Sequence, residues 1–262
     1  MTNTFDKGQT EFLINVAKDA GSAIMELHNI DLKVKHKIDN SPVTEADERA
    51  EKIIRLALKK HFPDIPFIGE EGYSSGERPD TSRGMFWLVD ALDGTKEFIE
   101  GRHEFTVNIA LIKFGHPIFG IVHAPARKET YWGSHAGAFK EKKGNKRQAI
   151  QTREPDKNGL TVTLSHSHRT GEEEYLKDFN IKQILRYGSS LKFCLIASGE
   201  ADLYPRLGNT SEWDTAAGHA VLLFAGGRMT RLDGGAFLYG KKDIINSHFV
   251  ASGYPTEEIK AQ

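Results

Sequence analysis

Acidic side chains occur at three places where a short apolar stretch ends or a new one begins. Asp90 and Asp93 lie in the run Asp-Ala-Leu-Asp-Gly-Thr, which directly follows the apolar residues 86–89. Glu70 also follows a short apolar stretch, and Asp214 precedes the apolar run 215–222. Like charges held at the end of a buried strand require a compensating cation, and carboxylate oxygens favour Mg²⁺ or Mn²⁺. The pattern predicts a divalent metal site built from three distant segments.

Each stretch taken alone also has a simpler interpretation. The Asp93-Gly94 pair could be the tip of a solvated turn. Asp214 could serve as an N-cap or first-turn acid that satisfies backbone N–H groups without any metal. The metal site is therefore favoured by the combination of the three stretches.

That combination resembles the signature of the inositol monophosphatase superfamily, a group of Mg²⁺-dependent, Li⁺-sensitive phosphatases. The matching motifs, in order and spacing, are Gly69-Glu70-Glu71, Asp90-x-Leu92-Asp93-Gly94-Thr95 and Trp213-Asp214-x-Ala216-Ala217-Gly218. The likeness covers nearly the whole chain. Within the superfamily, the strings SPVTEAD, DGTKEFI, GSSLKFC, LYPR and WDTAAGHAV are most similar to the CysQ-type 3′(2′),5′-bisphosphate nucleotidases.

The resemblance implies a role for each matched residue. Two or three Mg²⁺ ions would be held by Glu70, Asp90, Asp93, Asp214 and the backbone carbonyl of Leu92. Thr95 would help to position the attacking water, Glu70 would accept its proton, and Asp47 would support the Thr95 hydroxyl.

The chain departs from the family pattern at Ala91, where the family usually has proline. This difference loosens the unfolded loop at a cost of about 0.4–1 kcal/mol. Because Ala91 contributes no ligand, we expect reduced rigidity and no loss of chemistry.

A nucleoside bisphosphate carries a second phosphate, so its enzyme should offer cationic groups besides the metal ions. Ser190, Lys192 and Arg206 are the predicted contacts, together with Asp93, Gly94, Thr95 and Asp214 at the reacting phosphate. The simpler alternative is that Lys192 and Arg206 are surface charges.

The resemblance therefore implies a function in sulfur assimilation or in removal of a nucleotide by-product. The expected reaction is hydrolysis of adenosine 3′,5′-bisphosphate to AMP and phosphate, with inhibition by millimolar Li⁺. An inositol monophosphatase or related sugar phosphatase is the alternative enzyme. A non-catalytic metabolite-binding protein is the alternative of another class.

Hydrophobic periodicity predicts how the first half positions these residues. A helix is expected over 10–28 and another after a Thr44 cap, with Asp47 in its first turn. A short strand at 66–68 should lead into an acidic loop, and 72–83 should be an exposed loop. Strands rich in β-branched and aromatic residues, joined as hairpins, then predict a largely antiparallel sheet, at 85–90, 105–112, 117–125 and 129–140.

The second half alternates strands and helices, which is typical of a mixed α/β layer. Strands are predicted at 160–165, 181–188, 201–206 and 228–233, and helices at 172–179, 190–198 and 214–225. The polar stretch 140–158 suggests a division into residues 1–150 and 151–262. The fold class is thus α/β (α+β), and the family resemblance implies a layered αβαβα sandwich.

Composition excludes several classes of protein. The 262 residues are 39% hydrophobic and 27% charged with a net charge of −1, which is typical of a globular protein and not of a nucleic-acid-binding chain. No apolar run is long enough for a transmembrane segment. A single cysteine, Cys194, and the absence of a signal-like start favour a cytoplasmic protein. A homodimer and peripheral membrane association stay open.

Overall fold

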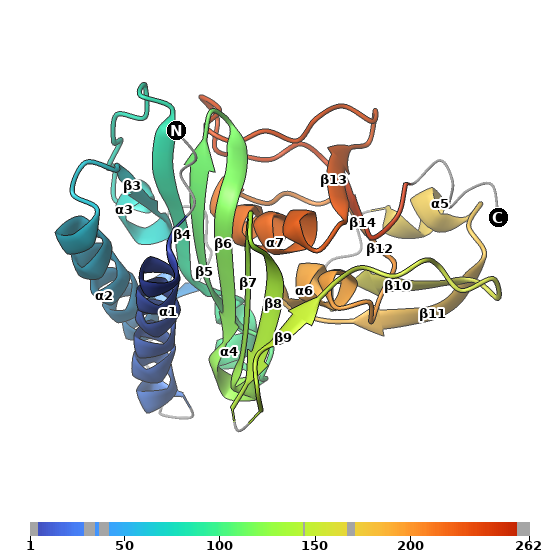
Figure 1. The fold of residues 1–262 in the computed structure, drawn as a ribbon, viewed down its shortest axis with the longest axis horizontal. Helices are drawn as coiled ribbons and strands as arrows, with labels where there is room; N and C mark the ends of the chain where they lie inside the picture. Colours follow the sequence, from blue (N-terminus) through green and yellow to red (C-terminus); the bar gives the residue numbers. More distant parts are fainter. Residues whose placement is uncertain (1–4, 29–34, 37–41, 144, 167–170, 256–262) are drawn as a thin grey trace.

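The computed structural model describes residues 5–28, 35–36, 42–143, 145–166 and 171–255, and it contains two β-sheets with helices between and outside them. Helices α1 (Lys7–Leu27) and α2 (Glu45–His61) cover the outer face of a seven-stranded sheet. On its other face lie α6 (Leu191–Ala197) and α7 (Glu212–Phe224), followed by a five-stranded sheet and α5 (Glu172–Leu176) (Figure 1). The predicted αβαβα order is confirmed.

The seven-stranded sheet follows chain order from β3 to β9. Only its first pair, β3 and β4, is parallel, and the described neighbours after it are antiparallel, which confirms the prediction for the first half. The last strand, β9, was not predicted and lies inside the polar stretch 140–158. The strands are β3 (Phe67–Gly69), β4 (Met85–Asp93), β5 (Thr106–Lys113), β6 (His116–Ala124), β7 (Glu129–Ser134), β8 (Gly137–Lys142) and β9 (Gln148–Ile150).

Strand β4 is apolar on both faces because both faces are covered. Trp87 and Val89 belong to the core that α1 and α2 share with the sheet. Phe86 and Leu88 point the other way, into the core formed with α6 and α7. Successive side chains of a strand alternate between faces, so this buried run places Asp90 on the α7 side.

Helix α2 begins where the sequence predicts. Thr44 is its N-cap, and Asp47 completes a capping box by accepting the Thr44 backbone N–H at 2.8 Å. A two-stranded hairpin, β1 (Lys35–His36) and β2 (Pro42–Val43), precedes it.

Helix α7 packs directly against the seven-stranded sheet through glycines. A Cβ atom on Gly120 of β6 would lie 2.6 Å from the backbone oxygen of Ala217. On β7, a Cβ atom on Gly133 would lie 2.7 Å from the oxygen of Ala220. Real side chains do not approach so closely, so the helix can reach this position only because both strands lack side chains there.

The five-stranded sheet has the order β11-β10-β12-β14-β13 and mixes parallel and antiparallel pairs, as predicted for the second half. Its strands are β10 (Leu160–Leu164), β11 (Ile181–Arg186), β12 (Leu203–Arg206), β13 (Arg228–Arg231) and β14 (Phe249–Ser252). Strand β14 was not predicted. The sheet buries one face against α6 and α7, and a smaller apolar cluster with Leu176 of α5 covers the other.

Some sequence-based boundaries are wrong. The run 129–140, predicted as one strand, forms two antiparallel strands, β7 and β8, joined by a turn at 135–136. Residues 70–74 form a short helix, α3 (Glu70–Ser74), where an acidic loop and the start of an exposed loop were expected. Helix α7 begins two residues before Asp214, because Ser211 is its N-cap. The 3₁₀ turn η1 (Pro125–Arg127) and helix α4 (Thr95–Ile99) complete the described elements.

The strands of the larger sheet end at Ile150, and those of the smaller sheet begin at Leu160. One apolar core nevertheless contains residues from both sides of this boundary. The division at residue 150 therefore stays a prediction. Among the described helices, none has the length and apolar character that crossing a membrane requires.

Candidate metal centre

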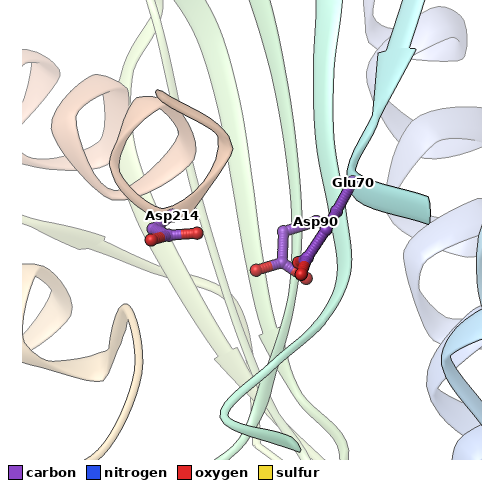
Figure 2. A group of neighbouring side chains, drawn as sticks. All are labelled: Glu70, Asp90 and Asp214. Carbon is purple, nitrogen blue, oxygen red and sulfur yellow. The ribbon is translucent and has the colours of Figure 1, made fainter. Parts of the chain in front are cut away.

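Three of the predicted metal ligands converge in space. One carboxylate oxygen each from Glu70, Asp90 and Asp214 lies within 4.8 Å of the other two. Figure 2 shows the side chains approaching from the start of α3, from strand β4 and from the start of α7. Segments separated by more than a hundred residues thus meet at one point, as the sequence predicts.

Two of the carboxylates lie in the first turn of a helix, and the third lies within a strand. Glu70 is the first residue of α3, and Asp90 is a buried residue of β4 on the face toward α7. Asp214 is the third residue of α7, and its Oδ2 accepts the backbone N–H of Ser211 at 2.8 Å. Asp214 therefore performs the capping role considered from the sequence, and it still faces the other two carboxylates.

Asp93 lies beside this group and is held by different partners. The pairing of β4 with β5 shifts register between Asp90 and Asp93, which turns Asp93 away from the regular strand direction. Its Oδ2 accepts the backbone N–H of Ser190 at 2.8 Å and the Asn108 side-chain amide at 3.1 Å. Asn108 is buried and was missed, although a lone amide in the apolar run FTVNIALI is a usable signal.

Leu92, Thr95 and Asp47 form a connected chain of contacts. The Thr95 hydroxyl lies 2.9 Å from Asp47 Oδ1 and 3.2 Å from the Leu92 carbonyl oxygen. Asp47 is buried and also accepts the Thr44 hydroxyl at 2.7 Å. The predicted support of Thr95 by Asp47 is present in this geometry. Between the two aspartates, Ala91 is buried in the core on the α1 and α2 side.

A cavity of about 320 Å³ opens onto the carboxylates. Apart from Asp47 and Ser190, all the predicted site residues line it, including Leu92, Gly94 and Thr95. The Ser190 side chain lies just behind the wall, where it donates to the Asp214 carbonyl oxygen at 2.8 Å. The residues that line the cavity but were not predicted include Glu97, Ser189, Tyr204 and Thr215.

Two buried cations lie on the wall formed by β12 and α6. Lys192 is 4% exposed and Arg206 is 6% exposed, so their alternative interpretation as surface charges is wrong. The Lys192 ammonium donates to the carbonyl oxygens of Tyr187 and Ser189 and lies over the Tyr204 ring at 5.2 Å. Arg206 donates to the Asn209 carbonyl, and its Nε has no hydrogen-bond partner among the described residues.

Burial perturbs the ionisation of this site strongly. Removal from water raises the pKa of Asp93 to about 6, although the nearby Lys192 charge opposes the rise. Burial also raises the pKa of Asp214, and the charges of Asp93 and Glu70 add to that rise. Lys192 has its pKa lowered to about 8, again chiefly by burial. Carboxylates held together in this way gain most from a bound cation, so the donor set fits a hard divalent metal ion.

Comparison with known proteins identifies the family. The model of the inositol monophosphatase family matches residues 7–261. The chain belongs to the inositol monophosphatase family. The family is metal-dependent, and the acidic cluster is where this member could hold a metal ion.

Two relatives carry the same printed name, 3′(2′),5′-bisphosphate nucleotidase CysQ. The protein from Salmonella typhimurium is 44% identical over 249 residues, which covers 93% of this chain and 99% of the relative. The protein from Buchnera aphidicola is 41% identical over 245 residues, which covers 92% of each. Among solved structures, CysQ from Bacteroides thetaiotaomicron superimposes with a TM-score of 0.80 at 32% identity and covers 95% of this chain and 98% of that one.

His166 follows Ser165, which lines the cavity, and contacts Glu104 at 2.8 Å. Residues 167–170 lie outside the described part of the chain. The assignment of individual residues as metal ligands or substrate contacts, the number of ions, and inhibition by Li⁺ stay predictions.

Proposed function

We propose that this chain is a Mg²⁺-dependent 3′(2′),5′-bisphosphate nucleotidase that converts adenosine 3′,5′-bisphosphate to AMP and phosphate. Support comes from relatives of that name at 41% and 44% identity over more than nine-tenths of the chain. The observation that carries the proposal in the structure is a cavity with an acidic cluster on one wall and two buried cations on another.

The two walls suit the two phosphates of the substrate. Glu70, Asp90, Asp93, Asp214 and the Leu92 carbonyl would hold two or three Mg²⁺ ions at the 3′-phosphate. Lys192 and Arg206, with Ser190 behind them, would balance the charge of the 5′-phosphate. An inositol monophosphate has no second phosphate, so it would leave the charge and hydrogen-bonding capacity of these buried cations unused.

Hydrolysis requires a water oxygen to bond to the 3′-phosphorus while the bond from phosphorus to the ribose 3′-oxygen breaks. Bound Mg²⁺ would supply charge neutralisation and activation of the nucleophile. Glu70 would accept the proton that the attacking water loses. The Thr95 hydroxyl proton has two acceptors, Asp47 and the Leu92 carbonyl, so lone pairs of its oxygen remain to accept a hydrogen bond from the water. The leaving 3′-oxygen takes up a proton from solvent and becomes the hydroxyl of AMP.

A substrate panel tests the proposal. Phosphate release should be measured from adenosine 3′,5′-bisphosphate, 3′-AMP and inositol 1-phosphate, each with Mg²⁺ and with a chelator. We expect hydrolysis only with Mg²⁺ and a kcat/KM for the bisphosphate at least about 100-fold above the others, because two charge-assisted contacts are lost with the second phosphate. A preference for inositol 1-phosphate would favour the inositol monophosphatase alternative, and the absence of any turnover would favour a binding protein.

A variant of the cationic wall sharpens the test. Arg206→Gln should lower kcat/KM for the bisphosphate by about 10- to 100-fold and change hydrolysis of 3′-AMP much less, because only the bisphosphate carries the group that Arg206 contacts. An equal loss on both substrates would assign Arg206 a role other than binding the second phosphate.

The cellular setting follows from the same proposal. A cytoplasmic enzyme that consumes adenosine 3′,5′-bisphosphate would contribute to sulfur assimilation or to removal of a nucleotide by-product. The net charge of −1 is not typical of a nucleic-acid-binding chain, so the proposed partner is the small phosphorylated nucleotide.

A further inference from the structure

Helix α3 carries Glu70 into the metal centre, yet its own sequence gives it no cap. The helix has five residues, and its N-cap is Gly69, which has no side chain to accept the first backbone N–H groups. Uncapped N–H groups at a buried helix start are costly, and a single-turn helix is not stable by itself. Another part of the chain must therefore fix this segment.

Glu51 of α2 supplies the missing cap. One of its carboxylate oxygens accepts the Glu71 backbone N–H at 2.7 Å, and the other accepts the Gly72 N–H at 3.1 Å. The side chain is only 4% exposed. A buried carboxylate that receives two N–H groups at a helix start makes strong, charge-assisted hydrogen bonds.

The Glu51 carboxylate is held in place by its neighbours on both sides. A Cβ atom on Gly69 would lie 2.5 Å from the Glu51 carboxyl carbon, so this glycine makes room for the cap. Arg55, one turn further along α2, donates to Glu51 at 2.7 Å and lies 4.7 Å from the centre of the Phe67 ring. Glu51 is therefore held on its far side as well.

The same helix also positions the other side of the reaction centre. Asp47 precedes Glu51 by four residues, so the two carboxylates lie one turn apart on α2. Asp47 accepts a hydrogen bond from the Thr95 hydroxyl at 2.9 Å, while Glu51 accepts hydrogen bonds from the backbone N–H groups of the residues that follow Glu70. One rigid helix thus sets the spacing between Glu70 and Thr95.

We propose that Glu51 is a positioning residue that holds Glu70 in the metal centre through the backbone of α3. The inference rests on the proposed role of Glu70 as a metal ligand. It extends the site to a residue that touches neither metal nor substrate.

Metal binding gives a test that does not depend on the substrate. Mg²⁺ and Mn²⁺ binding to wild type and Glu51→Gln should be measured by calorimetry. An amide oxygen can accept only one of the two N–H groups, and its NH₂ group faces the other, so we expect the dissociation constant to rise about 10- to 100-fold. Amide hydrogen exchange of Glu71 and Gly72 should accelerate in the variant.

Kinetics separate positioning from a purely structural role. In Glu51→Gln, the Mg²⁺ concentration for half-maximal activity should rise in parallel with the dissociation constant, kcat should recover largely at saturating Mg²⁺, and the nucleotide KM measured there should stay within about twofold of wild type. Glu51→Asp keeps the charge but shortens the reach, so it should lie between wild type and Glu51→Gln.

Glu129→Gln is the matched control. Glu129 is also a buried glutamate, 3% exposed, but it pairs with Lys142 and Tyr131 away from the metal centre. The Glu129→Gln variant should have a lower melting temperature and unchanged Mg²⁺ binding. Should Glu51→Gln fail to fold, Arg55→Gln loosens the same contact while keeping both N–H bonds, and a smaller shift in the same direction is expected.

Three results would overturn the inference. They are unchanged Mg²⁺ binding in a folded Glu51 variant, an equal change in Glu129→Gln, or no divalent-cation binding by wild type. If wild type binds Mg²⁺ but does not hydrolyse the bisphosphate, the proposed function fails and the positioning role stands.

Discussion

The Asp93 side chain connects several neighbouring residues of this site. Its carboxylate accepts the backbone N–H of Ser190 and the amide of Asn108, and it faces the Lys192 charge across the cavity. The interaction joins the end of β4 to the start of α6. A buried carboxylate with a raised pKa is costly in the metal-free protein and becomes favourable beside a cation.

Substitution of Asp93 by asparagine therefore separates charge from shape. We expect Asp93→Asn to lower kcat by about 100-fold or more at saturating Mg²⁺, because a charge facing the metal is lost. The melting temperature should not fall, since a buried charge with a raised pKa is removed and the amide oxygen can still accept the Ser190 N–H. Phosphate release and thermal unfolding check both parts, and full activity would remove Asp93 from the set of ligands.

A buried histidine outside the site makes stability depend on pH. His123 is 7% exposed, its Nδ1 contacts the Thr130 hydroxyl at 2.9 Å, and burial lowers its pKa to about 4, with the Lys18 charge adding to the effect. Below pH 6.5 the unfolded chain binds a proton that the folded chain refuses, so stability falls as pH drops toward 4. From pH 7 to pH 5 this group should cost about 2 kcal/mol.

Urea unfolding at pH 7 and pH 5 measures this effect. His123→Asn should lose less stability than wild type over that interval, whatever its stability at pH 7. The exposed His248→Asn variant should retain the wild-type difference. Equal pH dependence in wild type and His123→Asn would show that His123 does not set it.

At the level of elements, helix α7 depends on two strand glycines. Gly120→Ala would place a Cβ atom 2.6 Å from backbone and side-chain atoms of α7, so the helix must shift. We expect a loss of about 1–3 kcal/mol in the free energy of unfolding, together with reduced activity because Asp214 moves with the helix. Gly8→Ala, at an exposed position of α1 where the Cβ atom would lie 3.2 Å from the Asp6 carboxylate, should lose no more than about 0.5 kcal/mol. A neutral Gly120→Ala would mean that the contact is not rigid.

The elements that sequence analysis predicts are those whose signal is local. The apolar stripe and Thr44 cap predict α2, and the apolar runs predict β4, β5 and β6. The run 129–140 was predicted as one strand, and its division into β7 and β8 was missed. Helix α3 has no such signal, because its cap comes from Glu51 and its far end is fixed by Tyr73, whose ring lies 5.4 Å from that of Trp213. Strand β9 was missed because it has only three residues, lies at the sheet edge and is embedded in the polar stretch 140–158.

The residues of the candidate site also differ in whether a local sequence signal predicts them. Spacing and family likeness predict the carboxylates, because these residues carry recognisable motifs. The partners that orient them, such as Asn108 and Glu51, come from other elements and become visible only once the chain is folded. Sequence alone also leaves the exposure of Lys192 and Arg206 open, since burial depends on how α6 and β12 meet.

For the molecule as a whole, a divalent cation should act as a stabilising ligand. Binding at 100 times the dissociation constant contributes about 2.7 kcal/mol, which raises the melting temperature of a chain this long by about 5–10 °C. The rise measured with Mg²⁺ against a chelator should be much smaller in Asp214→Asn. An equal rise in both proteins would place the stabilising ion elsewhere.

The acidic cluster also has a consequence for the connectivity of the chain. Glu70 and Asp90 precede the polar connection at 151–159, and Asp214 follows it. If the polypeptide were expressed as two fragments divided there, neither fragment would contain a complete ligand set. Turnover in a mixture of the two would then report directly on their reassociation, which would make this enzyme a natural candidate for a split reporter.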